Sequence, residues 1–291
     1  MKRLTALLML FVSLFSFAQA DEVIVEDPEN GVWSYTSDVF SVSITRVKDD
    51  EQKLVWYECD LYCSPESPLT AYSSNPKKPG SKIQPPEKIA RDNKIVFAIN
   101  DDYFGFRVFN EKRVGIIIRH GELLYNKTYK SGSKNFPNLD TMALYPNGTF
   151  SVHDSKEYTG EEYLAMGATD VFAFGPWLVR SGEINPMLEK LATNNEPRVA
   201  IGMVEPYHYK VLVVEGRHKE SKGVPCSWVA EMMLQMGCTE VFNVDGGQTG
   251  VLVFMGKQLN HVGQFSSKGN YRNLSGMIGA GVSEQVPEYK D

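Results

Sequence analysis

The chain has 291 residues, of which 42% are hydrophobic and 23% are charged, a balance typical of a globular protein rather than a disordered one. It carries 30 Lys and Arg residues against 36 Asp and Glu residues, a net charge of -6. Because an acidic chain has no general attraction for polyanions, we expect no nucleic acid among its partners. Any phosphate group must then be bound by a local arrangement of residues.

The amino-terminal segment, residues 1–20, has the pattern of a signal peptide. Two basic residues precede an apolar run at residues 7–17, and a small-x-small cleavage pattern ends at Ala20. The apolar run is shorter than the roughly 20 residues that a bilayer span requires. We therefore expect cleavage after Ala20, no membrane span in the mature chain, and a secreted or periplasmic protein.

Residues 21–93 combine a β-rich segment with a proline-rich loop, and we expect them to pack on the main domain. Residues 39–47 and 53–61 alternate between apolar and polar side chains, which predicts strands with one buried face. Residues 64–86 contain six prolines and little apolar content, so we expect a loop without a helix or strand of its own. That loop is either a functional lid or a solvated connector.

The main domain, residues 94–291, shows many short strands and few helices. Glycine and asparagine at residues 119–122 and 146–148 supply the positive φ angles of tight hairpin turns. We predict an α+β fold with mixed, largely antiparallel β-sheets and a few flanking helices in a single large domain. The expected strands are residues 95–99, 114–119, 122–125, 141–145, 149–152, 200–204, 210–215, 240–244 and 250–255.

Two helices have clear boundary signals. Thr159 and Glu162 form a capping box that opens a short helix, and Gly167 ends it. A longer helix at residues 225–236 begins at a proline and ends before a glycine. An apolar stripe at helical spacing on the longer helix is assigned to the core rather than to a soft-metal site. The stripe consists of Val229, Met232, Met233 and Met236.

The cysteines and histidines give no metal-binding pattern. Cys59 and Cys63 are spaced for either a local disulfide or two free thiols. Cys226 and Cys238 flank a helix too long for a disulfide, so we expect them not to pair with each other. Zinc-type cysteine pairs are absent and the five histidines show no ligand spacing, so metal ligands stay unknown.

The stretch from Asn243 to Gly250, between two apolar strands, is the most informative candidate site. Gly246 and Gly247 would let the main chain approach a ligand and form an anion-binding nest of N–H groups. Asp245 would direct a carboxylate at the same point. The same residues also fit a plain hairpin turn, for which Asp-Gly is a common signal.

Three other strand ends carry polar groups. Glu215 and Arg217 lie two residues apart on an extended chain and share a face, where the arginine either holds the carboxylate ionised or binds a phosphate. A surface ion pair is the alternative. Arg198 enters an apolar strand, where its charge needs a partner or a ligand. Asn100 ends a strand before two acids that either bind a divalent cation or form a solvated turn.

Together these stretches resemble the phosphodiester glycosidase domain family, which includes N-acetylglucosamine-1-phosphodiester alpha-N-acetylglucosaminidase and many exported bacterial proteins associated with exopolysaccharide. The resemblance covers residues 94–282, and the motifs occur in the family's order. In this chain, Glu215 stands where the family commonly has Asp, and Gln248-Thr249 replaces Gly-Ser. The matching motifs are residues 100–104, 174–176, 197–202, 214–217 and 243–249, with Asn260 and Arg272.

The resemblance implies an exported hydrolase that removes an N-acetylglucosamine-like sugar from a sugar-1-phosphodiester on a glycan or surface polymer. Such a reaction needs carboxylates at the sugar carbon and donors for the phosphate charge. Asp245 and Glu215 are the expected catalytic pair, with their individual roles open. Substrate binding is assigned to Arg198 and Arg217 with the Gly246 and Gly247 amides at the phosphate, and to Asn100, Asp102, Asn243 and Thr249. A phosphorylated glycan or polysaccharide is the expected partner.

Two alternatives remain open from the sequence. The first is a metal-dependent phosphodiesterase that cleaves the P–O bond and uses Asp101, Asp102 and Asp245 as oxygen ligands. The second is a non-catalytic protein that binds glycans or assists exopolysaccharide assembly. The glycosidase needs no cofactor, whereas the phosphodiesterase needs a divalent cation.

Overall fold

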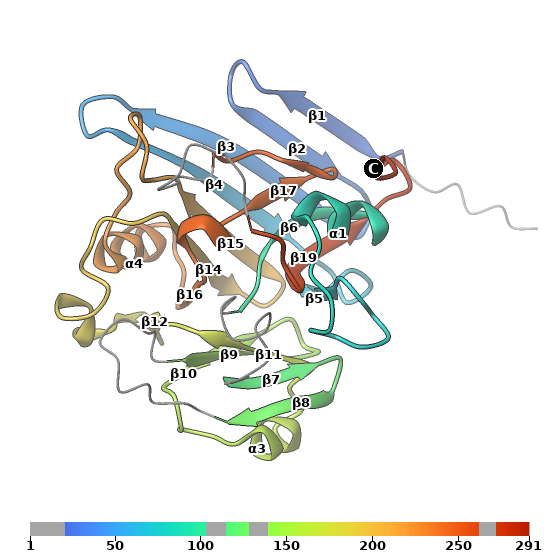
Figure 1. The fold of residues 1–291 in the computed structure, drawn as a ribbon, viewed down its shortest axis with the longest axis vertical. Helices are drawn as coiled ribbons and strands as arrows, with labels where there is room; N and C mark the ends of the chain where they lie inside the picture. Colours follow the sequence, from blue (N-terminus) through green and yellow to red (C-terminus); the bar gives the residue numbers. More distant parts are fainter. Residues whose placement is uncertain (1–20, 103–114, 128–138, 262–271, 291) are drawn as a thin grey trace, which may run out of the picture.

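The computed structural model of the protein describes residues 21–102, 115–127, 139–261 and 272–290. The predicted signal peptide and residues 103–104 of the first motif lie outside these ranges. The described residues form three β-sheets and three α-helices in one domain (Figure 1). The predicted α+β class, with largely antiparallel sheets and few helices, is confirmed.

The largest sheet has nine strands in the order β1-β2-β3-β4-β15-β14-β16-β12-β13, and each neighbouring pair is antiparallel. β4 pairs with the whole of β15, so the amino-terminal strands continue the sheet that the later strands begin. The strands are β1 (Val23–Asp27), β2 (Val32–Thr36), β3 (Ser41–Asp49), β4 (Leu54–Tyr62), β12 (Trp177–Arg180), β13 (Glu183–Ile184), β14 (Arg198–Glu205), β15 (His208–Val214) and β16 (Glu240–Val244).

Two five-stranded sheets complete the β structure. One has the order β10-β9-β11-β7-β8 and the other has the order β18-β17-β6-β19-β5. The first contains β7 (Gly115–Arg119), β8 (Glu122–Lys127), β9 (Asp140–Leu144), β10 (Phe150–His153) and β11 (Asp170–Phe174). The second contains β5 (Thr70–Ser73), β6 (Ile95–Asn100), β17 (Leu252–Phe254), β18 (Lys257–Gln258) and β19 (Gly276–Val282).

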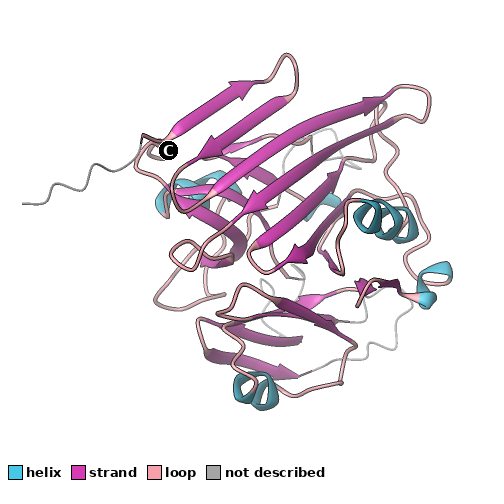
Figure 2. Ribbon diagram, turned by 180° about the vertical axis from the view of Figure 1, so that it is seen from behind, coloured by secondary structure: helices cyan, strands magenta, loops and turns pink. Residues whose placement is uncertain are grey.

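The three sheets surround one apolar core, and each outer face is covered by one helix (Figures 1 and 2). Helix α4 (Cys226–Gln235) covers the nine-stranded sheet, α1 (Pro86–Asp92) covers the sheet containing β6, and α3 (Gly160–Ala165) covers the sheet containing β7. Short 3-10 helices span Pro186–Glu189 and Gly247–Thr249. None of the helices among the described residues combines the length and the apolar character that crossing a membrane requires.

Helix α4 confirms the assignment of its methionine stripe to the core. Val229 and Met233 are fully buried beneath the nine-stranded sheet, and Met232 and Met236 pack at the margin of the same cluster. Cys226 and Cys238, at the two ends of this helix, are free thiols, as expected from its length. Cys59 and Cys63 are free thiols as well, which decides between the two alternatives for that pair.

The prediction that residues 64–86 contain no strand or helix is wrong. β5 lies within this segment and pairs with β19, which is more than 200 residues later in the chain, and α1 begins at Pro86. The apolar content of Thr70–Ser73 is too small to mark a strand by itself. Its pairing partner comes from the distant carboxyl-terminal part of the chain, so no local pattern reports the strand.

Helix α3 begins with the predicted capping box. The Thr159 hydroxyl accepts the Glu162 N–H at 3.3 Å, and the Glu162 carboxylate accepts the Thr159 N–H at 2.7 Å. We expect Thr159→Ala to lower the free energy of unfolding by about 1 kcal/mol, because one end of the helix loses a hydrogen-bond acceptor. Urea denaturation measures the change. Thr159→Ser keeps the hydroxyl and should behave like the wild type, and equal losses in both variants would contradict the capping role.

Candidate active site

Three strand ends of the nine-stranded sheet meet at one edge. Because β14 is antiparallel to both of its neighbours, Arg198 at its start pairs with Val214, and the next residue of β14 pairs with Val244. Glu215 directly follows β15, and Asp245 directly follows β16. Strand pairing therefore brings the two predicted carboxylates to the same edge as the start of β14.

Asn100 connects this edge to the sheet containing β6. Its buried side-chain N–H donates to the carbonyl oxygen of Asp245 at 2.6 Å, and its side-chain oxygen accepts the N–H of Val251 at 3.1 Å. These two bonds hold both ends of the segment between β16 and β17. Asn100 is thus beside Asp245, as the sequence predicts, but both of its side-chain polar atoms bind the main chain.

The turn after Asp245 needs glycine because other groups approach its main chain closely. A Cβ atom on Gly246 would lie 2.3 Å from the carbonyl oxygen of Pro197. Gly247 has a φ of +60°, and a Cβ atom there would lie 3.0 Å from a guanidinium nitrogen of Arg217. The Gly247 N–H donates to the Pro197 carbonyl at 3.1 Å, so this member of the predicted nest is bound within the protein.

The hairpin alternative for this turn is wrong. β16 belongs to the nine-stranded sheet and β17 belongs to the sheet containing β6, so the strands on either side of the turn do not pair with each other. The turn contains the 3-10 helix Gly247–Thr249 instead. It therefore connects two sheets at the place where the strand ends meet.

Two arginines lie on the glycine turn. Arg217 extends its guanidinium along Gly247, and its Nε donates to the Glu196 carboxylate at 2.6 Å. Arg272 donates from Nη1 to the Thr249 hydroxyl at 3.2 Å and from its main-chain N–H to the carbonyl of the preceding residue, Gln248, at 3.2 Å. Thr249 and Arg217 are therefore brought together as predicted, and Arg272 joins them.

Arg198 has a different environment from the one expected of a phosphate ligand. Its guanidinium donates to three main-chain carbonyl oxygens, those of Val224 at 3.1 Å, Ala192 at 3.1 Å and Asn194 at 2.9 Å. These hydrogen bonds stabilise the positive charge of Arg198 at the start of an otherwise apolar strand. The side chain therefore fastens two loops to the start of β14.

Glu215 is a buried carboxylate with several partners. Its Oε1 accepts the main-chain N–H of His261 at 2.6 Å, and its Oε2 lies 3.1 Å from Nε2 of His218. Its main-chain carbonyl accepts the Ser221 hydroxyl at 2.7 Å, and its N–H donates to the carbonyl oxygen of Val55 in β4 at 2.9 Å. Burial raises the pKa of Glu215 above its ordinary value of 4.5, although the His261 N–H opposes this by stabilising the charged form.

The two histidines beside Glu215 were not predicted as site residues. His218 is three residues later in the chain, whereas His261 follows β18, so their meeting depends on the fold rather than on sequence spacing. Their ring centroids are 4.5 Å apart. Burial lowers the pKa of His218 below its ordinary value of 6.5 and so favours the neutral form of its imidazole.

Asp101 and Asp102 do not form a solvated turn, because both are almost fully buried against Arg119. The Asp102 carboxylate pairs closely with Arg119 Nη2 and also accepts the N–H of Ala173 at 2.6 Å. Asp101 lies 3.5 Å from the same guanidinium nitrogen. Arg119 was not predicted as a site residue from the sequence. The signal that could have identified it is a charged residue at the end of an isoleucine-rich strand.

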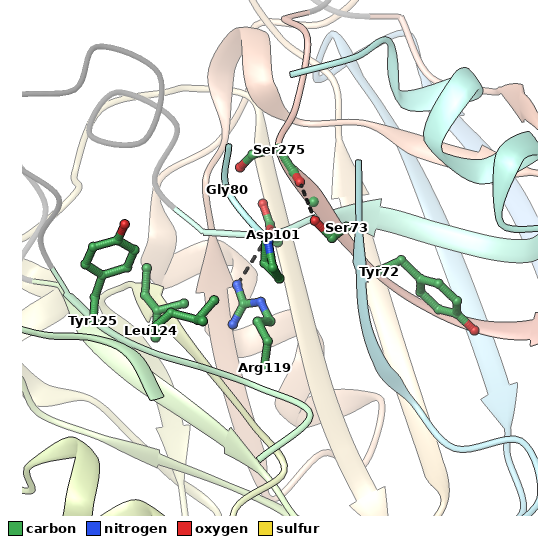
Figure 3. Close-up of a pocket in the computed structure, with 11 residues that line it drawn as sticks. Tyr72, Ser73, Gly80, Asp101, Arg119, Leu124, Tyr125 and Ser275 are labelled. Atoms are coloured by element: carbon green, nitrogen blue, oxygen red, sulfur yellow. Dashed lines mark hydrogen bonds and ion pairs between the residues drawn. The ribbon is translucent and has the colours of Figure 1, made fainter. Parts of the chain in front are cut away.

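A small pocket opens beside this ion-pair cluster (Figure 3). Figure 3 shows Asp101 and Arg119 at its centre, with Tyr72 and Tyr125 on opposite sides. Ser73 and Ser275 add hydroxyl groups to the lining. Asp101 directly follows Asn100, so the pocket adjoins the residues that hold the segment after Asp245.

The side-chain oxygen of Asn243 is an acceptor with no partner among the described residues. Its side-chain N–H donates to the carbonyl of Gly175 at 2.9 Å, and its own carbonyl accepts the Gly175 N–H at 3.1 Å. Its side-chain oxygen is buried and has no hydrogen-bond partner among the residues that the structure describes. A buried acceptor of this kind is suited to a hydroxyl group of a ligand.

A family model described as Phosphodiester glycosidase matches residues 93–280, the part of the chain that carries the strand-end carboxylates and the glycine turn. This match supports a glycosidase-type function. The chain belongs to the phosphodiester glycosidase family.

Individual relatives are distant. The SPbeta prophage-derived uncharacterized protein YomE of Bacillus subtilis (strain 168) is 28% identical over 179 residues, 60% of this chain and 26% of that protein, so the match spans about a quarter of the relative's length. The catalytic domain of zebrafish N-acetylglucosamine-1-phosphodiester alpha-N-acetylglucosaminidase, auto-inhibited by its pro-peptide, has a TM-score of 0.66 at 18% identity and 84% coverage of each chain. A hypothetical protein from Synechocystis has a TM-score of 0.55 at 14% identity, over 85% of this chain and 63% of that one. Both structures share this fold.

Proposed function

We propose that the protein is an exported phosphodiester glycosidase that releases an N-acetylglucosamine-like sugar from a sugar-1-phosphodiester on a glycan or surface polymer. The observation that carries the proposal is the meeting of Glu215, Asp245 and the glycine turn at one sheet edge, in a chain of this family. Export is supported by the signal-peptide pattern of residues 1–20.

Each part of the reaction has a candidate group. Glu215 is the general acid, because burial favours its protonated form, and it gives its proton to the bridging oxygen as the bond from that oxygen to the sugar carbon breaks. Asp245 faces the positive charge that develops on the sugar. A water molecule then adds its oxygen to the sugar carbon and loses a proton, which completes the hydrolysis. Arg217 and Arg272 stabilise the departing phosphate.

The sugar would lie beside Asn100 and Asp101, because Asn100 contacts the main chain of Asp245 and Asp101 lines the pocket. Tyr72 and Tyr125 offer aromatic surface, and the Asn243 side-chain oxygen, which has no partner within the described ranges, offers a hydrogen bond to a hydroxyl group. Asp102 supports the lining of this pocket, because its carboxylate holds Arg119 in place.

Sugar release from a panel of sugar-1-phosphodiesters, in heavy-oxygen water with and without a chelator, tests the proposal. Label on the released sugar shows cleavage of the bond between sugar carbon and oxygen, as expected. Label on the phosphate, with activity lost in chelator, would instead show a metal-dependent phosphodiesterase. Absence of release together with polysaccharide binding that survives Asp245→Asn would show a binding protein.

The assignment of Glu215 as the acid predicts the pH dependence. An acid must be protonated to act, so kcat/KM should be highest at low pH and fall as pH rises through the pKa of Glu215, which burial places above 4.5. A pH–rate profile on the wild type and on Glu215→Gln measures this. The alkaline limb should disappear in the variant. A rate that instead rises with pH over the same range would make Glu215 the base or nucleophile.

A further inference from the structure

Glu215, His218 and His261 place three potential ligand atoms at one point, the carboxylate oxygen and one nitrogen from each ring. These atoms all lie within 4.8 Å of one another, and this is the one group of three with such spacing among the residues that the structure describes. The donors come from two separate segments: the turn after β15 and the segment after β18. Glu215 is buried and His261 is exposed, so the cluster is anchored inside and open to solvent on one side.

The hydrogen bonds of this cluster leave Nε2 of His218 without a partner among the described residues. Oε1 of Glu215 is held by the N–H of His261, and Oε2 faces His218. Nε2 of His218 is 3.1 Å from that oxygen without the alignment of a hydrogen bond, and it is buried with no partner elsewhere in the described part of the chain. A buried imidazole nitrogen without a partner is costly unless something else occupies its lone pair.

We propose that Glu215, His218 and His261 bind a zinc ion, with the fourth position of a tetrahedral site left to solvent or a ligand. Two imidazoles and one carboxylate form a common three-ligand set for zinc with an open position. Zinc bonds of about 2.1 Å put tetrahedral ligand atoms about 3.4 Å apart, so the longest separation in the cluster, at most 4.8 Å, needs to shorten by up to about 1.4 Å. Rotation of the exposed His261 ring supplies this movement. Calcium and magnesium prefer six or more oxygen donors and do not suit this set.

The zinc site would regulate the proposed reaction, an effect that rests on the proposed function. Glu215 belongs both to the proposed zinc site and to the proposed catalytic pair. A zinc ion bound to its carboxylate blocks the group that the reaction uses, so zinc is expected to inhibit sugar release rather than support it.

Isothermal titration of zinc chloride into the full-length, chelator-treated protein tests the site. We expect one zinc ion that is lost or weakened about 100-fold or more in His218→Ala and in His261→Ala, since even outer-shell changes at zinc sites cost 10- to 100-fold. His120→Asn is the matched control, because His120 is exposed at the tip of the β7–β8 turn and asparagine tolerates its positive φ. Thermal unfolding without metal confirms that each variant is folded.

Cobalt supplies a second readout, because a tetrahedral cobalt site with nitrogen and oxygen ligands has strong visible absorption. Unchanged zinc affinity in the His218→Ala/His261→Ala double variant, or displacement of zinc by equimolar calcium, would overturn the proposal. Binding is measured without substrate and release is measured in chelator, so the two proposals can fail separately. Zinc binding without any sugar release removes the proposed function, and release without zinc binding removes the zinc site.

Discussion

Replacing Glu215 with Gln is expected to lower kcat for sugar release by about 10²- to 10⁴-fold, the range associated with general acid–base catalysis. The amide has nearly the shape of the carboxylate, and its oxygen can still accept the N–H of His261. It cannot transfer a proton. KM should therefore change much less than kcat, and steady-state kinetics with a sugar-1-phosphodiester measures the two values separately.

Glu205→Gln is the matched control for this experiment. Glu205 ends β14 at the edge opposite Glu215, and its side chain is 70% exposed. The same substitution there should leave kcat unchanged. If Glu215→Gln kept the wild-type kcat while Asp245→Asn lost activity, Glu215 would have no role as the acid and the proton would have to come from another group.

The largest effect on stability is expected at Arg119. Its Nη2 pairs with Asp102 and lies near Asp101, and its Nη1 donates to the carbonyls of Ile118 at 2.9 Å and Val171 at 2.6 Å. Arg119→Met keeps much of the apolar stem but removes the guanidinium that pairs with the two buried carboxylates. We expect a loss of about 3–5 kcal/mol in the free energy of unfolding, as for other broken buried ion pairs. Urea denaturation at pH 7 measures this loss.

Lys48→Met tests whether the size of that effect comes from burial. Lys48 pairs with Asp50 at 3.1 Å, but their side chains are 50% and 82% exposed. Removal of such an exposed pair should cost no more than about 1 kcal/mol. If both variants lost a similarly small free energy of unfolding, the buried carboxylates of Asp101 and Asp102 would not need Arg119 for their stabilisation.

Features set by neighbouring residues were predictable from the sequence. The apolar alternation at residues 39–47 and 53–61 marks β3 and β4 to within two residues, because each strand buries one face in the core. The capping box of α3 is a local hydrogen-bond pattern, and it was found for the same reason. Asp245 and Glu215 were recognisable because polar residues directly follow apolar strands and match family motifs.

Features set by distant pairings were not predictable. His261 reaches Glu215 only because β17 and β18 belong to a different sheet from β15, and no spacing along the chain reports this. The partner of Asp102 is Arg119, on a strand of another sheet. The role of Arg198 was also hidden, since a sequence shows that a charge needs partners but not that main-chain carbonyls supply them.

Because β4 pairs with β15, the large sheet extends beyond the part of the chain that the family model matches. The family model matches residues 93–280, whereas β4, which supplies both a strand edge for β15 and the carbonyl that receives the Glu215 N–H, ends at Tyr62. A gene fragment cut at the family boundary would carry both carboxylates but leave β15 as an open edge, and open strand edges recruit other chains. Expression boundaries, and any transfer of this site to another scaffold, should therefore follow the strand order of the sheet rather than the limits of the motifs.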